Sequence, residues 1–294
     1  MIPVTPIYDI CALSDFGEDD ILISRFAPYL EHHKNLHAAH RHTFYHLVLF
    51  TEGAGSHAID FENFAVKPYQ VYFMIPGQVH SWSFDGFTDG YIINFSASFF
   101  QSFLLNPSYA DSFSFFRGNN KSAVIDLPQQ LHEHVRTLFE EIIGEYEGRG
   151  TRWADMLRVS ILKFFILVGR LNNAGDDTGP ASYSQTLLGN FQKLINEHFT
   201  RLKLPKDYAE LLYITPNHLN AVCKDLLGLS AGEVIRNRIV LEAKRLLTNP
   251  KLTIAEIAFE LNFNDNSYFT KFFKKFEGKT PEEFRKNVID NHHE

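Results

Sequence analysis

The chain has 294 residues, of which 45% are hydrophobic, 14% aromatic and 21% charged, and its formal net charge at pH 7 is −7. This composition is typical of a globular protein and excludes an intrinsically disordered or collagen-like chain. Because the chain is about twice as long as the commonest domain, we expect two domains.

The charge is distributed unevenly along the chain. Residues 1–182 contain 12 basic and 21 acidic residues, a net charge of −9, whereas residues 183–294 contain 16 basic and 14 acidic residues, a net charge of +2. Residues 172–182 are polar, contain Gly, Asp and Pro, and show no periodicity, which is typical of a linker. We therefore predict one domain over residues 1–171, a linker over 172–182 and a second domain over 183–294.

Neither a membrane nor a secreted location is indicated. The longest apolar run, Phe164–Val168, lies between Lys163 and Arg170 and is far too short to span a bilayer. The first ten residues lack the basic and apolar regions of a secretory signal. The only two cysteines, Cys11 and Cys223, lie in different halves of the chain, which excludes a disulfide framework. We expect a cytoplasmic protein with no membrane partner.

The first half is predicted to contain a small barrel or sandwich of short strands. Segments rich in β-branched and aromatic residues at 45–51, 56–61, 69–75 and 91–95 are separated by glycine and proline turn signals. Short strands at this spacing are typical of all-β architectures.

Two helices are predicted to follow these strands. After Asp126, a plausible cap, apolar residues recur every three or four positions up to Tyr146, as in an amphipathic helix. A second helix, over about 152–171, is apolar around most of its circumference and must bury two faces. One face can pack on the barrel and the other on a second subunit, which predicts a homodimer. The alternative is that both faces are covered within one chain.

The second half is helical in pattern and contains an internal repeat. Residues 208–212 match residues 257–261 at an offset of 49, and residues 219–228 match residues 269–278 at an offset of 50. Each copy consists of a short helix, a tight connection, a second helix and a terminal glycine, which is the helix-turn-helix arrangement.

The two longer helices of the repeat have matching faces at 100° per residue. Their predicted caps are Thr215, which precedes Pro216, and Asp265. The apolar faces consist of Leu219, Val222, Cys223 and Leu226 in the first copy and Phe269, Phe272, Phe273 and Phe276 in the second. The polar faces consist of Asn217, Asn220, Ala221 and Lys224 in the first copy and Ser267, Thr270, Lys271 and Lys274 in the second.

Amides, hydroxyls and lysines near the start of a helix are the groups that contact base edges and phosphates in a major groove. A connecting helix over about 231–248 would be roughly 27 Å long, which would place the two recognition helices about one DNA turn apart. The alternative is a protein-interaction domain with a solvated basic face. The predicted DNA contacts are Asn217, Asn220, Lys224, Asn266, Ser267, Thr270, Lys271 and Lys274.

From about Phe191 to Asn287 the chain resembles the DNA-binding domain of AraC-type transcription regulators. The residues that carry this resemblance are Ile257-Ala258, Phe263, Ser267-Tyr268-Phe269, Phe273-Lys274-Lys275, Gly278, Thr280-Pro281 and Phe284-Arg285, with a fainter echo in Tyr208-Ala209, Thr215, Leu219 and Gly228. The turn glycine of the family is replaced by Asn262 in the second unit and by Tyr213 in the first, and tyrosine tolerates a left-handed backbone poorly. Ala221 replaces a position that is often a large base-reading side chain.

Five histidines lie between residues 40 and 80: His40, His42, His46, His57 and His80. The spacing His40-x-His42-x3-His46, followed by Pro76-Gly77-x2-His80, resembles the two motifs of the cupin barrel, with His46 where metal-dependent cupins carry Glu. Alternate residues on the strands of a small barrel face inward, so four of these histidines can converge. Imidazoles are ligands for zinc, iron, copper and nickel.

The sensor barrels of AraC-type regulators also resemble cupins and keep part of this pattern without catalysis, and the second motif here lacks a residue between Pro76 and Gly77. The resemblance therefore implies an effector pocket, and we assign no catalytic residue, no metal and no cofactor. The candidate pocket residues are His40, His42, His46, His80, Trp82 and Tyr45.

The predicted fold class is α+β multidomain, with an N-terminal cupin-like β-barrel, two following helices, and a C-terminal all-α domain of two helix-turn-helix units. The predicted function is a sequence-specific transcription regulator, not an enzyme, that is controlled by a small-molecule effector. Its expected partners are double-stranded DNA, the effector, a second copy of the chain and RNA polymerase. The alternative is a metal-dependent cupin enzyme with a helical interaction domain, since no Ser/His/Asp order, phosphate-binding loop or paired-carboxylate motif supplies another chemistry.

Overall fold

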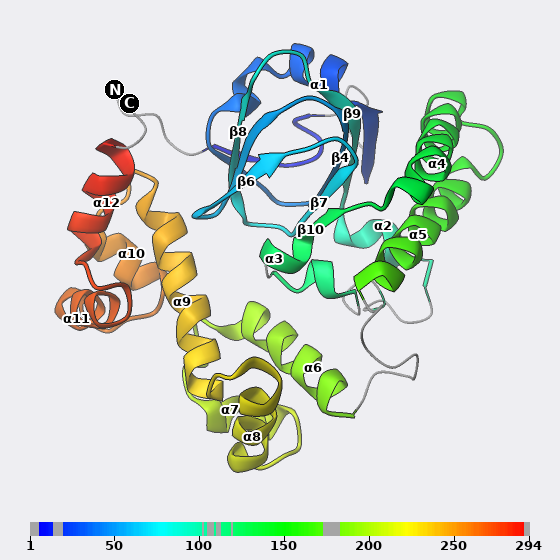
Figure 1. Cartoon of the computed structure of the whole chain (residues 1–294). Helices are drawn as coiled ribbons and strands as arrows, with labels where there is room; N and C mark the ends of the chain where they lie inside the picture. Colours follow the sequence, from blue (N-terminus) through cyan, green and yellow to red (C-terminus); the bar gives the residue numbers. More distant parts are fainter. Residues whose placement is uncertain are drawn as a thin grey trace. The chain divides into compact units, whose positions relative to one another are not determined.

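The computed structural model of the chain describes residues 6–13, 20–101, 103–104, 109, 113–118, 120–172 and 183–290. The chain divides into two compact units, one of them Pro6–Thr178 and the other containing Gly179–Glu294 (Figure 1). Residues 173–182 of the predicted linker lie outside the described residues. In the described part of the chain, no helix has the length and apolarity needed to cross a membrane.

The first unit contains two five-stranded sheets that face each other (Figure 1). The first sheet has the strand order β1 (Ile7–Tyr8), β3 (His40–His42), β8 (Val79–Phe84), β5 (Gly55–Ile59) and β6 (Glu62–Val66). The second has the order β10 (Val124–Asp126), β7 (Gln70–Met74), β4 (Tyr45–Glu52), β9 (Asp89–Phe95) and β2 (Ile21–Arg25). All pairs are antiparallel except β1 with β3. The predicted strand over 56–61 ends earlier, at Ile59, because Asp60 takes a left-handed turn conformation with φ 52°.

The second sheet is buried on both faces, and alternation along β4 assigns each side chain to one of them. Leu47 and Leu49 belong to the core on the outer face of this sheet, whereas Val48 and Phe50 belong to the core inside the barrel. Successive side chains of a strand point to opposite faces, so adjacent residues of one strand serve two separate cores.

Helices α4 (Gln129–Gly148) and α5 (Trp153–Asn172) cover the outer face of the second sheet (Figure 1). The expectation that Asp126 caps α4 is wrong. Asp126 is the last residue of β10 and accepts a hydrogen bond of 2.9 Å from Gln70 Nε2, and the residue before α4 is Pro128, which offers no side-chain cap. The carboxylate that the helix was expected to use therefore makes a side-chain contact between β10 and β7.

Helix α5 buries one apolar face and leaves part of the other exposed. The buried face consists of Leu157, Ile161, Phe164, Phe165 and Val168. On the other side, the residues Met156 and Val159 are 52% and 53% exposed. Within one chain, the described residues thus cover only one of the two faces that were predicted to be buried.

Shorter helical segments complete the first unit: α1 (Phe26–His32), η1 (Lys34–His37), α2 (Ala97–Gln101), η3 (Ser114–Phe116) and α3 (Asn120–Ala123). The second unit is entirely helical over residues 183–290, as predicted. Its helices are α6 (Tyr183–His198), α7 (Pro205–Leu211), α8 (Pro216–Leu227), α9 (Ala231–Leu247), α10 (Ile254–Glu260), α11 (Asn266–Glu277) and α12 (Pro281–Asp290).

Helix α9 is the central element of the second unit, since it packs against α7 and α8 and also against α10, α11 and α12 (Figure 1). The pairs α7–α8 and α10–α11 are the two helix-turn-helix units that the repeat predicts. One apolar core, which includes Leu219, Ile239 and Phe269, runs through both units. The 17 residues of α9 span about 26 Å at 1.5 Å per residue.

The turn of each helix-turn-helix unit contains one residue in the left-handed region of backbone conformation, as the family pattern implies. Tyr213 has φ 55° and Asn262 has φ 54°. The Tyr213 side chain is 96% exposed, so no packing of its ring offsets the cost of this backbone conformation. The first turn therefore stores strain that the second, with asparagine, largely avoids.

We expect Tyr213→Gly to raise the free energy of unfolding by about 0.5–1 kcal/mol, because glycine adopts a positive φ without steric cost and no contact is lost. Chemical denaturation of both proteins measures the change. Asn262→Gly is the matched control and should have a smaller effect. A loss of stability in Tyr213→Gly would show that the exposed ring has a structural role.

Candidate functional site

The two longer helices of the repeat, α8 and α11, begin at the predicted caps. The Thr215 hydroxyl accepts a hydrogen bond of 3.2 Å from the His218 backbone N–H, and the Asp265 carboxylate accepts one of 2.7 Å from the Tyr268 N–H. Both helices end at a left-handed glycine, Gly228 or Gly278. The predicted caps are therefore confirmed, and they define which side chains lie in the first turn of each helix.

The buried faces agree with the predicted register except at their last position and at Phe272, which is only partly buried. Leu219, Val222 and Cys223 are buried in α8, and Phe269 and Phe273 are buried in α11. The equivalent residues Leu226 and Phe276 are each 37% exposed. The Phe276 ring is covered on one side by Phe272 and by the Arg236 guanidinium of α9, which lies 5.1 Å from the ring centroid.

Most of the predicted DNA-contacting side chains are exposed. Six of the eight predicted residues are exposed to solvent: Asn217, Lys224, Asn266, Ser267, Lys271 and Lys274. The residues at the intervening repeat position, Asn220 and Thr270, are only partly exposed because they lie at the border between the polar and apolar faces.

Asn220 has a partner inside the protein. Its Oδ1 accepts a hydrogen bond of 3.1 Å from the backbone N–H of Ala231, the first residue of α9. Ser230 and Glu233 add a reciprocal capping box at the same helix start. Asn220 thus connects α8 to the central helix α9. The helical periodicity by which Asn220 was assigned to the polar face did not indicate this role.

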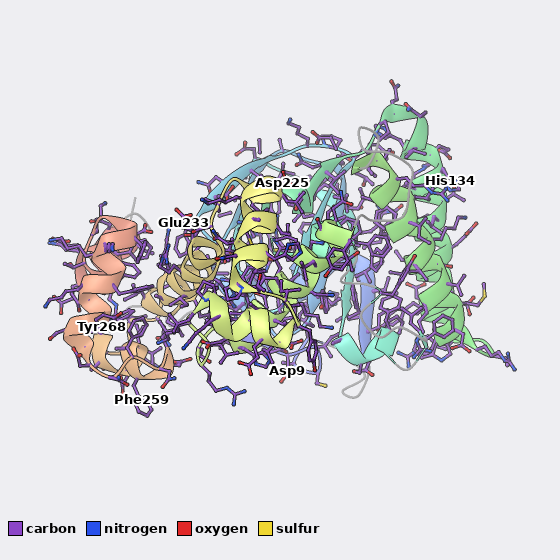
Figure 2. All side chains as sticks on the ribbon, turned by 90° about the horizontal axis from the view of Figure 1, so that it is seen from below. Asp9, His134, Asp225, Glu233, Phe259 and Tyr268 are labelled. Carbon is purple, nitrogen blue, oxygen red and sulfur yellow. The ribbon has the colours of Figure 1, made fainter. Side chains whose placement is uncertain are left out.

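Sequence reasoning did not select the residues that follow Asn217 and Ser267. His218 and Tyr268 occupy equivalent positions of the repeat in the first turn of their helices, and both are exposed. Tyr268, labelled in Figure 2, is 60% exposed. The repeat was the signal that could have found them. Its offset of 50 residues makes His218 and Tyr268 equivalent, and each directly follows a predicted DNA contact.

The second candidate site is a cluster of histidines inside the barrel. His40 and His42 come from β3, His46 from β4, His57 from β5 and His80 from β8. None of the five is more than 3% exposed, and Trp82, also on β8, is 4% exposed. The predicted convergence of His40, His42, His46 and His80 is therefore observed.

Hydrogen bonds join three of these imidazoles into a chain. His42 Nε2 lies 2.6 Å from His80 Nε2, and His80 Nδ1 lies 3.1 Å from His57 Nε2. The other two bond outside the cluster: His40 Nδ1–H donates to the Ala38 carbonyl at 2.7 Å, and His46 Nδ1–H donates to Asn94 Oδ1 at 2.6 Å.

Burial keeps the imidazoles neutral. It lowers the pKa of His40 to about 4 and that of His46 to about 3, because the charged form is poorly solvated inside the barrel. The pKa values of His42, His57 and His80 are also well below the usual range, mainly through burial and further through the neighbouring imidazoles.

His57 belongs to the cluster although it was not among the predicted pocket residues. It lies outside the cupin-like spacing, but it pairs with Trp82 across β5 and β8 and points into the barrel. Side chains alternate between the two faces of a strand, so the predicted strand over 56–61 was the available signal that His57 and Ile59 share one face. In the structure His57 and Ile59 are buried and Ala58 is less so.

Tyr45 lies apart from this cluster. Its ring stacks on Phe95 with a centroid distance of 5.0 Å and meets Phe116 edge-on at 5.2 Å, in the core beneath α4 and α5. Tyr45 and Leu47 share one face of β4, whereas His46 is on the other, so Tyr45 and His46 cannot both face the barrel interior.

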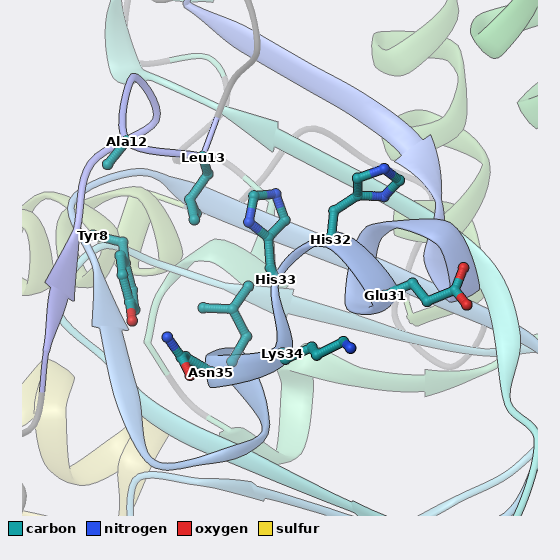
Figure 3. Close-up of a pocket in the computed structure, with 9 residues that line it drawn as sticks. Tyr8, Ala12, Leu13, Glu31, His32, His33, Lys34 and Asn35 are labelled. Atoms are coloured by element: carbon teal, nitrogen blue, oxygen red, sulfur yellow. The ribbon is translucent and has the colours of Figure 1, made fainter.

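A separate open cavity of about 310 Å³ lies beside α1 and η1 (Figure 3). Its lining residues are Tyr8, Ala12, Leu13, Glu31, His32, His33, Lys34, Asn35 and Leu36. None of the predicted pocket residues lines it. Tyr8 connects this cavity to the histidine cluster, because its ring meets that of His40 edge-on at a centroid distance of 5.7 Å.

These features define a two-domain regulator: a ligand-binding barrel and a helical domain with two helix-turn-helix units. Residues 24–162 match the AraC-like ligand binding domain, and residues 208–287 match a helix-turn-helix domain. The chain belongs to the AraC family of transcription regulators.

Known proteins with similar sequences are also regulators. The arabinose operon regulatory protein of Salmonella typhimurium is 24% identical over 247 residues, which cover 82% of this chain and 83% of that protein. The arabinose operon regulatory protein of Escherichia coli is 23% identical and covers 82% and 80% respectively. The Msm operon regulatory protein of Streptococcus mutans is 31% identical over 110 residues, 37% of this chain and 40% of that protein.

Two solved structures are also similar to this chain. ToxT of Vibrio cholerae O395 is 15% identical, covers 90% of this chain and 96% of its own, and superposes with a TM-score of 0.44. The C-terminal domain of the response regulator yesN of Fusobacterium nucleatum is 28% identical, covers 32% of this chain and 93% of its own, and has a TM-score of 0.31.

We expect the stability of the metal-free chain to fall as the pH is lowered from 7 to 5. The five imidazoles have low pKa values when folded and ordinary values, near 6.5, when unfolded, so below about pH 6.5 the unfolded state binds more protons. Between pH 6 and pH 5 the free energy of unfolding should change by more than the ~1.4 kcal/mol per pH unit that a single histidine can contribute.

Urea denaturation at several pH values, in the presence of a chelator, measures this slope. His134→Gln, which replaces an exposed histidine of α4 outside the cluster, is the control variant (Figure 2). A stability that is level between pH 7 and pH 5 would show that the buried imidazoles are not neutralised by folding.

Proposed function

We propose that the chain is a sequence-specific double-stranded DNA-binding regulator of transcription whose DNA binding is controlled by an effector in the N-terminal barrel. The observation that carries this proposal is the pair of equivalent helix-turn-helix units, each with an exposed polar face on its longer helix. Both units share one core through α9, so they bind as a single body.

The dimensions of α9 support recognition of two neighbouring stretches of major groove. A span of about 26 Å, with a recognition helix near each end, is comparable to one helical turn of DNA, which is about 34–36 Å. Exposed amides, hydroxyls and lysines then face base edges and phosphates from both helices.

Control by an effector is supported by the match of residues 24–162 to a ligand-binding domain and by relatives named for the arabinose operon. The buried polar side chains of the barrel, His40, His42, His46, His80 and Trp82, are the candidates for holding the ligand. An effector acts by binding more tightly to one of two states of the protein, which changes the affinity for DNA by the same factor. RNA polymerase is the expected further partner of such a regulator.

Selection from random double-stranded DNA tests the proposal. We expect recovery of a common site of about 16–20 base pairs per monomer, because two turns of groove are read. Equal affinity for all sequences at moderate salt would contradict it, because phosphate contacts alone carry no sequence information.

We expect Lys271→Ala to weaken binding to the selected site by about 1–3 kcal/mol with relaxed specificity, because a lysine in the first half of α11 can reach a base edge. Lys274→Ala should weaken binding to all sequences and reduce the salt dependence by about one phosphate contact. Titrations at several salt concentrations separate the two effects. Lys286→Ala, which removes an exposed charge from α12, is the control. If Lys271→Ala alters neither affinity nor site preference, the assigned register is wrong.

We further propose a homodimer that covers the exposed side of α5. Met156 and Val159 lie on this side, and a second copy would remove them from water. We expect Val159→Lys to shift the protein toward monomer in sedimentation velocity, because a charge would be buried at the interface. His134→Lys places the same charge on an exposed position of α4 and should leave the assembly unchanged. A wild-type chain that is monomeric at high concentration would contradict this arrangement.

A further inference from the structure

The histidine cluster contains nitrogen atoms that neither solvent nor protein satisfies. His40 Nε2, His42 Nδ1, His46 Nε2 and His57 Nδ1 are buried and have no hydrogen-bond partner among the described residues. Buried polar atoms are nearly always satisfied in folded proteins, and each one left without a partner destabilises the fold. Four such nitrogens in one cluster therefore indicate a ligand that binds imidazoles.

The packing of the cluster limits the size of this ligand. The His80 ring lies 4.2 Å from that of His40, 4.8 Å from that of His42, 5.1 Å from that of His46 and 5.3 Å from that of His57, measured between centroids. Rings at these distances are in contact, so the space enclosed between the imidazoles suits an occupant of the size of a single ion. An organic effector held by the same residues would contact the cluster from outside this space.

We propose that the cluster binds one divalent transition-metal ion through His40, His42 and His80, with His57 and His46 beside them. The three ligating residues each offer a ring nitrogen within 4.8 Å of the others, and all three are buried. Zn–N bonds of about 2.1 Å bring ligand nitrogens to roughly 3.4 Å from one another, so binding needs only small movements of the rings. The direct 2.6 Å contact between His42 and His80 would open to admit the ion.

The surroundings of the cluster orient the imidazoles for this role. The Nδ1–H of His40 is held by the Ala38 carbonyl and that of His46 by Asn94 Oδ1, which leaves each Nε2 with a lone pair directed away from its anchor. Metal-ligating histidines are typically held in this way through their other nitrogen. His57 acts similarly on His80, because its Nε2 contacts His80 Nδ1 at 3.1 Å.

The donor set determines the class of ion. Neutral imidazoles are the form that coordinates a metal, and the cluster contains no carboxylate. Nitrogen ligands favour zinc, nickel, cobalt or copper, whereas magnesium and calcium require oxygen ligands. The cluster also includes His57, which is not part of the cupin-like spacing. The proposed metal site does not depend on whether the helical unit binds DNA.

Cobalt binding to the full chain tests the inference. After dialysis against a chelator, we expect one equivalent of Co²⁺ to bind with a dissociation constant below about 1 μM, to produce visible ligand-field absorption, and to be displaced by Zn²⁺. Zn²⁺ should also raise the melting temperature, whereas Mg²⁺ should not. Fewer than 0.1 equivalent of Co²⁺ bound, or equal stabilisation by Mg²⁺, would overturn the proposal.

Substitutions locate the ion. We expect His42→Gln and His80→Gln each to weaken Co²⁺ binding at least 100-fold, and His57→Leu to weaken it by about 10-fold to 100-fold through the loss of the hydrogen bond to His80 Nδ1. His134→Gln, on the surface of α4, is the matched control and should bind as the wild type does. Circular dichroism verifies that each variant is folded. If one of them is not, the absorption spectrum and stoichiometry of the wild type still decide the question. Unchanged binding in folded His42→Gln and His80→Gln proteins would show that the ion lies elsewhere.

Discussion

Burial of the second sheet on both faces is the constraint on which the first unit depends. Strands β4, β7 and β9 are almost continuously buried, so every second side chain must suit the barrel interior and every other one the helical layer. A shift by one residue would exchange Leu47 with His46 and place an imidazole beneath α4 and α5. The apolar packing on the outer face thus holds the histidines in their inward orientation.

Polar contacts at the β2 edge of the second sheet also connect the barrel to α4. The Arg25 guanidinium of β2 contacts the Asp89 carboxylate of β9 and lies 2.8 Å from Glu140 of α4, and it is 4.6 Å from the centroid of the Tyr91 ring. The arginine and Asp89 mutually favour their charged forms, and hydrogen bonding to Arg25 and to the backbone holds the pKa of Asp89 below its usual range against the opposing effect of burial. These contacts attach β2 and β9 of the barrel to α4.

The helical unit was predictable because its signals are local. Thr215 and Asp265 were recognisable as caps, and the apolar faces of α8 and α11 from their periodicity, since these signals depend on residues within a few positions of one another. The equivalence of the two helices came from the repeat at an offset of 50, and the left-handed turns from the resemblance to AraC-type regulators. The errors there are also instructive. Phe276 is more exposed than its register implies and Asn220 bonds to Ala231, and both depend on how α9 lies against the two units.

In the barrel, the sequence by itself predicted the strands over 45–51, 56–61, 69–75 and 91–95, and its cupin-like spacing indicated that four histidines can converge. The strand pairing decided the rest. His57 joined the cluster because β5 lies beside β8, Tyr45 belongs to the opposite core because it is one residue from His46, and Asp126 serves β10 instead of α4. Local patterns report periodicity and caps, whereas the neighbours of a side chain on a sheet come from distant parts of the chain, and only the tertiary structure brings them together.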